Sequence, residues 1–83
     1  MARYYLHLYN GIGAVPDEEG VEVESLAGAY RLAVESIRSL VSADVKQGRI
    51  DLRGRIEIAG ADQTRARIVP FAEAVHLTLG DDR

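Results

Sequence analysis

The chain has no cysteine and no tryptophan, and only one phenylalanine and two prolines among its 83 residues. Without cysteine there is no disulfide framework, no thiolate nucleophile and no cysteine-based zinc site. No apolar run approaches the roughly 20 residues that span a bilayer, and the N-terminal stretch MARYYLHLYNG lacks the pattern of a signal peptide. We therefore expect a cytoplasmic protein with no membrane partner.

What is present is the composition of an ordinary globular domain, with 47% hydrophobic and 28% charged residues. The length predicts a single domain, residues 1–83, that is ordered except at its ends, where the sequence GDDR forms a frayed tail. A chain of this size hides only about 60 to 65% of the surface that its unfolded form exposes. Because no disulfide compensates for a small core, contact with a partner would add stability.

Charge is distributed unevenly along the chain, although the net charge is only −3. Residues 1–24 contain one arginine and five carboxylates, whereas residues 49–67 contain five arginines and three carboxylates. Two interpretations follow. The charges neutralise each other within the protein or between subunits, or the arginines form a basic surface for an external polyanion.

The first predicted element is a strand, because RYYLHLY at residues 3–9 alternates between two faces. Tyr4, Leu6 and Leu8 share the face that we assign to the core, and the residues between them share the other face. Asparagine, glycine and proline residues between positions 10 and 16 then predict a loop, and GVEV at residues 20–23 predicts a short extended segment.

Between Ser25 and Gly48 the apolar residues recur with the period of a helix. Ser25 is a candidate N-cap and Gly48 a candidate terminating residue, which predicts one long helix over about residues 25–47. The predicted apolar stripe consists of Leu26, Ala29, Tyr30, Ala33, Val34, Ile37, Leu40 and Val41. The opposite face, which includes Gly28 and Arg38, is predicted to face solvent.

Asp44 is the exception, because it projects from the middle of the apolar stripe. Either the last turn of the helix overhangs the sheet, which is the interpretation we favour, or Asp44 pairs with an arginine such as Arg49 or Arg53.

The second half of the chain predicts a β-hairpin. The sequence RGRIEIAG is predicted as a strand with Ile56 and Ile58 inward, GADQT as the turn, and RARIVPF as the returning strand with Ala66 and Ile68 inward. Pro70 cannot donate to a ladder, so it ends this strand or lies at an edge or bulge. The sequence AEAVHLTL predicts a turn followed by a final strand.

Together these elements predict an α+β fold of two layers. One long amphipathic helix packs on one face of a mostly antiparallel sheet of three or four strands.

The glycines and carboxylates of YNGIGAVPDEEGVEV do not match known ligand-binding loops. A dinucleotide fingerprint has a third glycine where this chain has Pro16, and the carboxylates at 17–19 would repel phosphates. A calcium loop of the EF-hand type has an oxygen ligand where this chain has Val21. We therefore interpret the segment as a solvated turn, with no metal bound.

Catalytic chemistry is not indicated. His7 and His76 are the only histidines, and neither belongs to a recognisable set of nucleophile, base and orienting group or of zinc ligands. We expect neither a catalytic residue nor a cofactor.

The sheet face opposite the core gives the most specific functional hypothesis. Its predicted residues are aromatic or basic, and they are Tyr5, His7, Tyr9, Arg53, Arg55, Arg65 and Arg67. Single-stranded nucleic acids bind to such platforms by stacking their bases on the aromatic rings and pairing their phosphates with the arginines. Self-association surfaces also favour tyrosine and arginine.

The segments RYYLHL, PDEEGVEV, DLRGRIEI and VPFAEAV resemble a family of small bacterial proteins whose function is uncharacterised. The resemblance covers about residues 3–75, and its most specific parts are Arg3-Tyr4-Tyr5 with His7, Asp17 to Gly20, and Pro70-Phe71. Members commonly have phenylalanine where this chain has Leu6. The resemblance implies a compact α+β fold and no catalytic residue.

The chain is also similar to HicB-type antitoxins, which begin with an RYY-like strand, carry an acidic D-x-x-G stretch and continue into an alanine-rich helix. It lacks the glycine and threonine that usually precede that helix.

The sequence therefore predicts a non-catalytic interaction module that forms a homo-oligomer, with an unknown protein as a possible further partner. The alternative is a nucleic-acid-binding or antitoxin-like module that uses the arginine-bearing face.

Overall fold

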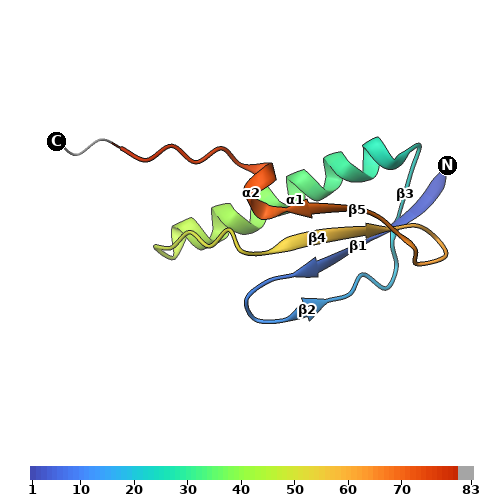
Figure 1. The fold of residues 1–83 in the computed structure, drawn as a ribbon, viewed down its shortest axis with the longest axis horizontal. Coiled ribbons are helices and arrows are strands. Elements are labelled where there is room, and N and C mark those ends of the chain that lie inside the picture. Colours follow the sequence, from blue (N-terminus) through green and yellow to red (C-terminus); the bar gives the residue numbers. More distant parts are fainter. Residues whose placement is uncertain (81–83) are drawn as a thin grey trace.

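The computed structural model describes residues 1–80 and contains a sheet with one long and one short helix (Figure 1). In chain order the elements are β1 (Ala2–Tyr9), β2 (Ala14–Val15), β3 (Val21–Val23), α1 (Leu26–Lys46), β4 (Arg55–Ala59), β5 (Arg65–Pro70) and α2 (Phe71–Ala74). The predicted α+β fold, with a long helix packed on an antiparallel sheet, is confirmed.

The sheet has five strands, all paired antiparallel, in the order β2-β1-β4-β5, and β3 pairs with the N-terminal part of β1. The additional strand β2 results from a tight turn after β1. The side-chain Oδ1 of Asn10 accepts hydrogen bonds from the backbone N–H groups of Ile12 and Gly13 at 2.8 and 3.1 Å. This turn folds the chain back, so that Ala14 and Val15 pair with the end of β1.

Both predicted ends of α1 are confirmed. The backbone N–H of Gly28 donates to the Oγ of Ser25 at the N-cap, and Gly48 follows the C-cap with a φ of +90°. The apolar stripe of α1 packs on the sheet, and the residues that form the buried core are Ala29, Ala33, Ile37, Ile56, Ile58, Val69, Phe71 and Ala74.

Of the residues predicted on the solvent face of α1, Gly28 is buried, and Arg38 is exposed but also makes an internal hydrogen bond. A Cβ at position 28 would lie 3.2 Å from the Cβ of Val23, so the glycine allows β3 to approach the helix. The Nε of Arg38 donates to the backbone carbonyl of Ala74 at 2.8 Å. The helical wheel missed both contacts because the chain segments that meet this side of α1 are short and irregular.

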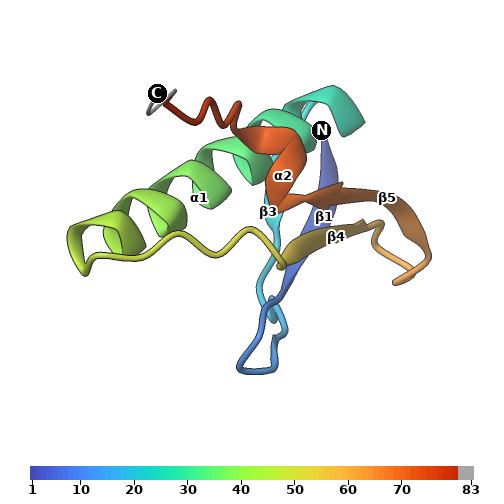
Figure 2. The ribbon, with the colours of Figure 1, turned by 60° about the vertical axis from the view of Figure 1, so that its left-hand side comes forward.

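The C-terminal part of α1 extends past the sheet, as favoured for Asp44 (Figure 2). Leu40 consequently remains 40% exposed, although it belongs to the predicted apolar stripe. Asp44 also lies 3.7 Å from the guanidinium of Arg49, so the second interpretation of this residue holds as well.

The predicted inward residues of β5 are wrong. Val69 is fully buried, whereas Ile68 lies opposite Glu57 on the other face and is 39% exposed. The phase that buries Val69 also buries Phe71 two residues later, and this pair removes more apolar surface from water than Ala66 and Ile68 would. A register irregularity at Ile58 and Ala59 accompanies this phase.

Pro70 ends β5, which is an edge strand, as predicted. The predicted final strand is wrong: the chain forms the short helix α2 and then has no regular structure from Val75 to Gly80. Of the predicted frayed tail, residues 81–83 lie outside the described residues.

Candidate functional site

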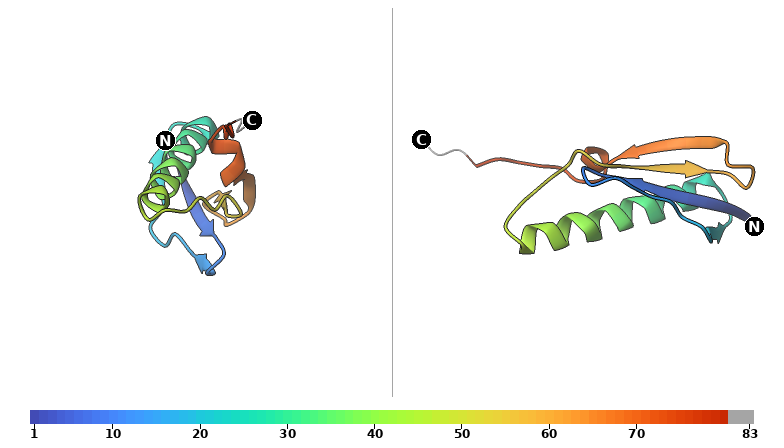
Figure 3. Two further views of the ribbon diagram at one scale, coloured as in Figure 1. Left: turned by 90° about the vertical axis from the view of Figure 1, so that its left-hand side faces the viewer. Right: turned by 90° about the horizontal axis from the view of Figure 1, so that it is seen from below.

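One face of the sheet is covered by α1, and no helix among residues 1–80 covers the other (Figure 3). We call this second face the outer face. The pairing of β1 with β4 places Tyr5 opposite Ala59, His7 opposite Glu57, and Tyr9 opposite Arg55. The outer face is formed by Tyr5, His7, Tyr9, Arg55, Glu57, Ala59, Arg65 and Ile68.

Aromatic and guanidinium groups contact one another on the outer face. The rings of Tyr5 and His7 are stacked with centroids 6.3 Å apart, and the guanidinium of Arg55 lies 4.3 Å from the centroid of the Tyr9 ring. Such cation–π contacts stabilise a pair by about 0.5 to 1 kcal/mol at exposed sites. The contact with Arg55 therefore favours the observed orientation of the Tyr9 ring.

The two arginines of the outer face share one carboxylate. The Nε of Arg55 donates to Glu57 at 2.8 Å, and Arg65 lies 3.9 Å from the other carboxylate oxygen of Glu57. Glu57, which the sequence analysis did not include in the face, thus neutralises part of its positive charge. Because Glu57 lies between the inward residues Ile56 and Ile58, the alternation of the strand is sufficient to place it on the outer face.

Arg67 does not lie on the outer face. The register of β5 turns it towards α1, where its guanidinium stacks 4.1 Å from the centroid of Tyr30 and donates to Glu73 at 2.6 Å. The hydroxyl of Tyr30 donates to the same carboxylate at 2.7 Å, and this hydrogen bond raises the pKa of Tyr30. The error follows from the wrong phase assigned to β5.

Arg53 does not lie on the outer face either, because β4 begins only at Arg55. It belongs to the connector between α1 and β4 and makes a bidentate contact with Asp51, with Nε and a terminal nitrogen at 2.9 and 2.8 Å from the two carboxylate oxygens. Arg53 thus pairs with a residue of the connector and does not continue β4.

Both ring nitrogens of His7 are used within the chain. The backbone N–H of Asp17 donates to its Nδ1 at 3.0 Å, so the ring proton resides on Nε2, which faces the Oε1 of Gln63 at 3.0 Å. His7 thus ties the acidic loop, residues 16–20, and the turn of the hairpin to β1.

The carboxylate of Asp17 organises the acidic loop. It accepts hydrogen bonds from the backbone N–H groups of Leu6 at 3.1 Å, Gly20 at 3.0 Å and Glu19 at 3.3 Å. Leu6 lies between the residues of β1 that pair with β3 and with β2, so Asp17 takes the place of a missing strand partner. Burial raises the pKa of Asp17, but these N–H donors and nearby His7 outweigh it and lower the pKa below 3.8.

Gly20 completes this loop. Its φ is +74°, and a Cβ there would lie 2.8 Å from the backbone oxygen of Tyr4. The acidic loop is therefore a built structural unit in which Asp17 and Gly20 have specific positions, and not only a solvated turn.

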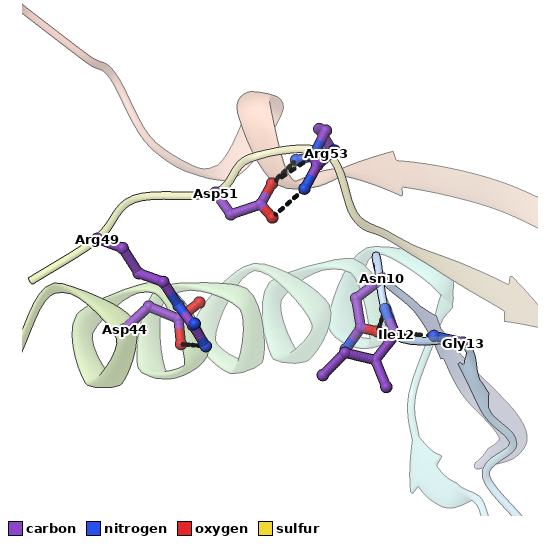
Figure 4. Close-up of polar contacts among 7 residues, drawn as sticks. All are labelled: Asn10, Ile12, Gly13, Asp44, Arg49, Asp51 and Arg53. Atoms are coloured by element: carbon purple, nitrogen blue, oxygen red, sulfur yellow. Dashed lines mark hydrogen bonds and ion pairs between the residues drawn. The ribbon is translucent and has the colours of Figure 1, made fainter. Parts of the chain in front are cut away.

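A hollow lies between the overhanging part of α1, the connector and the tip of the β1–β2 turn (Figure 4). We call it the groove, and its volume is about 440 Å³. Ile12, Leu40 and Phe71 contribute apolar surface to it.

The charged residues of the groove form two ion pairs, Asp44 with Arg49 and Asp51 with Arg53 (Figure 4). Hydrogen bonds from Arg53 lower the pKa of Asp51 to about 2, and the same ion pair raises the pKa of Arg53. The sequence analysis did not predict the groove, because it arises from the length by which α1 exceeds the sheet.

The profile of a domain of unknown function (DUF6894) matches residues 3–72. The chain belongs to this family. No curated protein and no solved structure matches the chain. The resemblance to an uncharacterised family is thereby confirmed, and its Asp17-to-Gly20 segment is the acidic loop described above.

Two further observations concern binding and the membrane. Among residues 1–80, no helix combines the length and apolarity needed to cross a bilayer. Within the same part of the chain, no three histidine, aspartate or glutamate side chains are grouped as a metal site requires.

Proposed function

We propose that this DUF6894 protein is a non-catalytic module that associates with itself through the outer face. The observation that carries the proposal is the sheet face that no helix covers, on which the rings of Tyr5 and Tyr9 are only partly buried and the side chain of Ile68 is 39% exposed. Tyrosine and arginine are enriched in the centres of protein interfaces because they combine large contact area with polar ends.

The charges of the outer face suit contact with a second copy. Arg55 and Arg65 extend from either side of Glu57, so a two-fold arrangement can place an arginine of one copy near the carboxylate of the other without burying an unpaired charge. The free edge of β5 is a less favourable contact, because Pro70 has no N–H to donate to a further strand.

Nucleic-acid binding is the less favoured function. Each of the five arginines between residues 49 and 67 has a carboxylate partner, and these partners are Asp44, Asp51, Glu57 and Glu73. Phosphate binding would have to compete with these ion pairs, whereas a protein interface can retain them. The partners belong to neighbouring elements and not to the acidic segment of residues 17–24.

The double variant Tyr5→Ala with Tyr9→Ala is expected to lower both the oligomer population and the melting temperature, because both rings leave the interface. Size-exclusion chromatography with light scattering measures the first quantity and circular dichroism the second. Ser36→Ala on the exposed side of α1 is the control and should change neither. A double variant whose mass at each concentration equals that of the wild type would contradict the outer-face contact.

A further inference from the structure

The segment after α2 has the pattern of a strand but no partner among the described residues. Val75 has an extended backbone, with φ −133° and ψ 149°, and the sequence VHLTL alternates apolar and polar side chains. Leu77 and Leu79 are 51% and 79% exposed. We call residues 75–80 the arm, and Figure 1 shows it running away from the sheet.

The groove offers the complementary surface. Leu40 and Ile12 face it with exposed apolar side chains, 40% and 93% exposed, and the ring of Phe71 lies against it. Alternate leucines of an extended segment point to the same side, so Leu77 and Leu79 can enter one groove together. Removing this apolar surface from water is favourable in proportion to its area.

We propose that the arm of one copy docks in the groove of a second copy, with Leu77 and Leu79 against Leu40 and Ile12. This inference rests on the proposed self-association and specifies a second contact for it, separate from the outer face.

The position of α2 favours the groove of a second copy over the arm's own groove. The Nε of Arg38 donates a hydrogen bond to the carbonyl of Ala74, which is the last residue before the arm. Arg38 and Leu40 are two residues apart, so they lie about 200° apart around the axis of α1. The arm therefore starts beside the flank of α1 that carries Arg38, and not beside the flank that carries Leu40. In Figures 1 and 2 it passes above the C-terminal half of α1, whereas the connector that forms the groove runs below it.

Cysteine crosslinking tests the contact directly, because the chain has no cysteine of its own. Two single variants, Leu79→Cys and Leu40→Cys, are mixed and oxidised gently, and disulfide-linked dimers are counted on a non-reducing gel. We expect the mixture to form them at least several-fold faster than Leu79→Cys mixed with Ser42→Cys, because Ser42 lies on the other side of α1 from Leu40. Equal rates in the two mixtures would overturn the inference.

The double variant Leu40→Cys with Leu79→Cys distinguishes the two possible grooves. A disulfide within one chain, at the mass of a monomer, would show that the arm occupies its own groove and would also overturn the inference. Covalent dimers of the double variant support it.

A second pair of variants separates this inference from the outer-face contact. Leu77→Asp with Leu79→Asp should lower the oligomer mass, while His76→Asp with Thr78→Asp, at the alternate positions, should not. If the leucine variant keeps the wild-type mass and Tyr5→Ala with Tyr9→Ala loses it, the arm contact is wrong and the outer-face contact stands. The reverse result supports the arm contact and contradicts the outer-face contact.

Discussion

Ile37→Ala is expected to lower the free energy of unfolding by about 2 to 4 kcal/mol, whereas Leu40→Ala should lower it by less than about 1 kcal/mol. Ile37 is fully buried between α1 and the sheet, and its truncation leaves a cavity in a core that contains few large side chains. Leu40 lies three residues further along the same apolar stripe, but it is 40% exposed where α1 overhangs the sheet.

Urea denaturation of both variants, at one low protein concentration, measures the difference. The loss at Ile37 is a large part of the total stability, because a domain of this size unfolds with only about 4 to 12 kcal/mol. Equal losses at Ile37 and Leu40 would mean that the sheet extends under the whole helix, contrary to the overhang.

Asp17→Ala should lower the free energy of unfolding by about 2 to 3 kcal/mol at pH 7. The substitution removes the acceptor of three backbone hydrogen bonds, and hydrogen bonds to a charged group contribute about 1.5 to 3 kcal/mol each when they are not coupled. Here the three share one carboxylate, so their contributions do not add. Glu18→Ala, at the exposed neighbouring carboxylate, should stay within about 0.5 kcal/mol.

The same residue predicts a pH dependence. Because folding lowers the pKa of Asp17 below 3.8, its ionised form stabilises the folded chain above that pH. This contribution is lost as the pH falls through the lowered pKa of the folded state. Chemical denaturation between pH 7 and 2 should therefore show the wild type and Asp17→Asn converging in acid, and a constant difference between them would contradict the role of the charge.

β1, β3, α1 and the β4–β5 hairpin could be predicted from local sequence, whereas β2 and α2 were not predicted. The alternation in β1, the N-cap at Ser25, the glycine at position 48 and the turn between β4 and β5 each follow from neighbouring residues. Which side of β5 faces the core could not be predicted in this way, because both of its alternating sets of residues contain apolar side chains. The set with Val69 and Phe71 is buried, and Arg67, which shares their face, contacts Glu73 six residues later and Tyr30, which is far away in the sequence.

The candidate site shows the same division between local and long-range information. The alternation of side chains along a strand is sufficient to predict that one face contains Tyr5, His7, Tyr9 and Arg55. The role of Asp17 was missed, although an aspartate three residues before a glycine is a local signal for a side chain that binds the following N–H groups. Its bond to Leu6 and the link between His7 and the loop depend on how the chain returns to β1, which local patterns do not show.

The mass of the wild-type protein in solution, measured by light scattering across a concentration series, tests the central claim of self-association most directly. The outer face and the arm together predict a mass above the 9.1 kDa of one chain, rising with concentration towards at least twice that value. A mass of 9.1 kDa that does not change up to about millimolar concentration, where association would contribute only about 4 kcal/mol, would contradict the account.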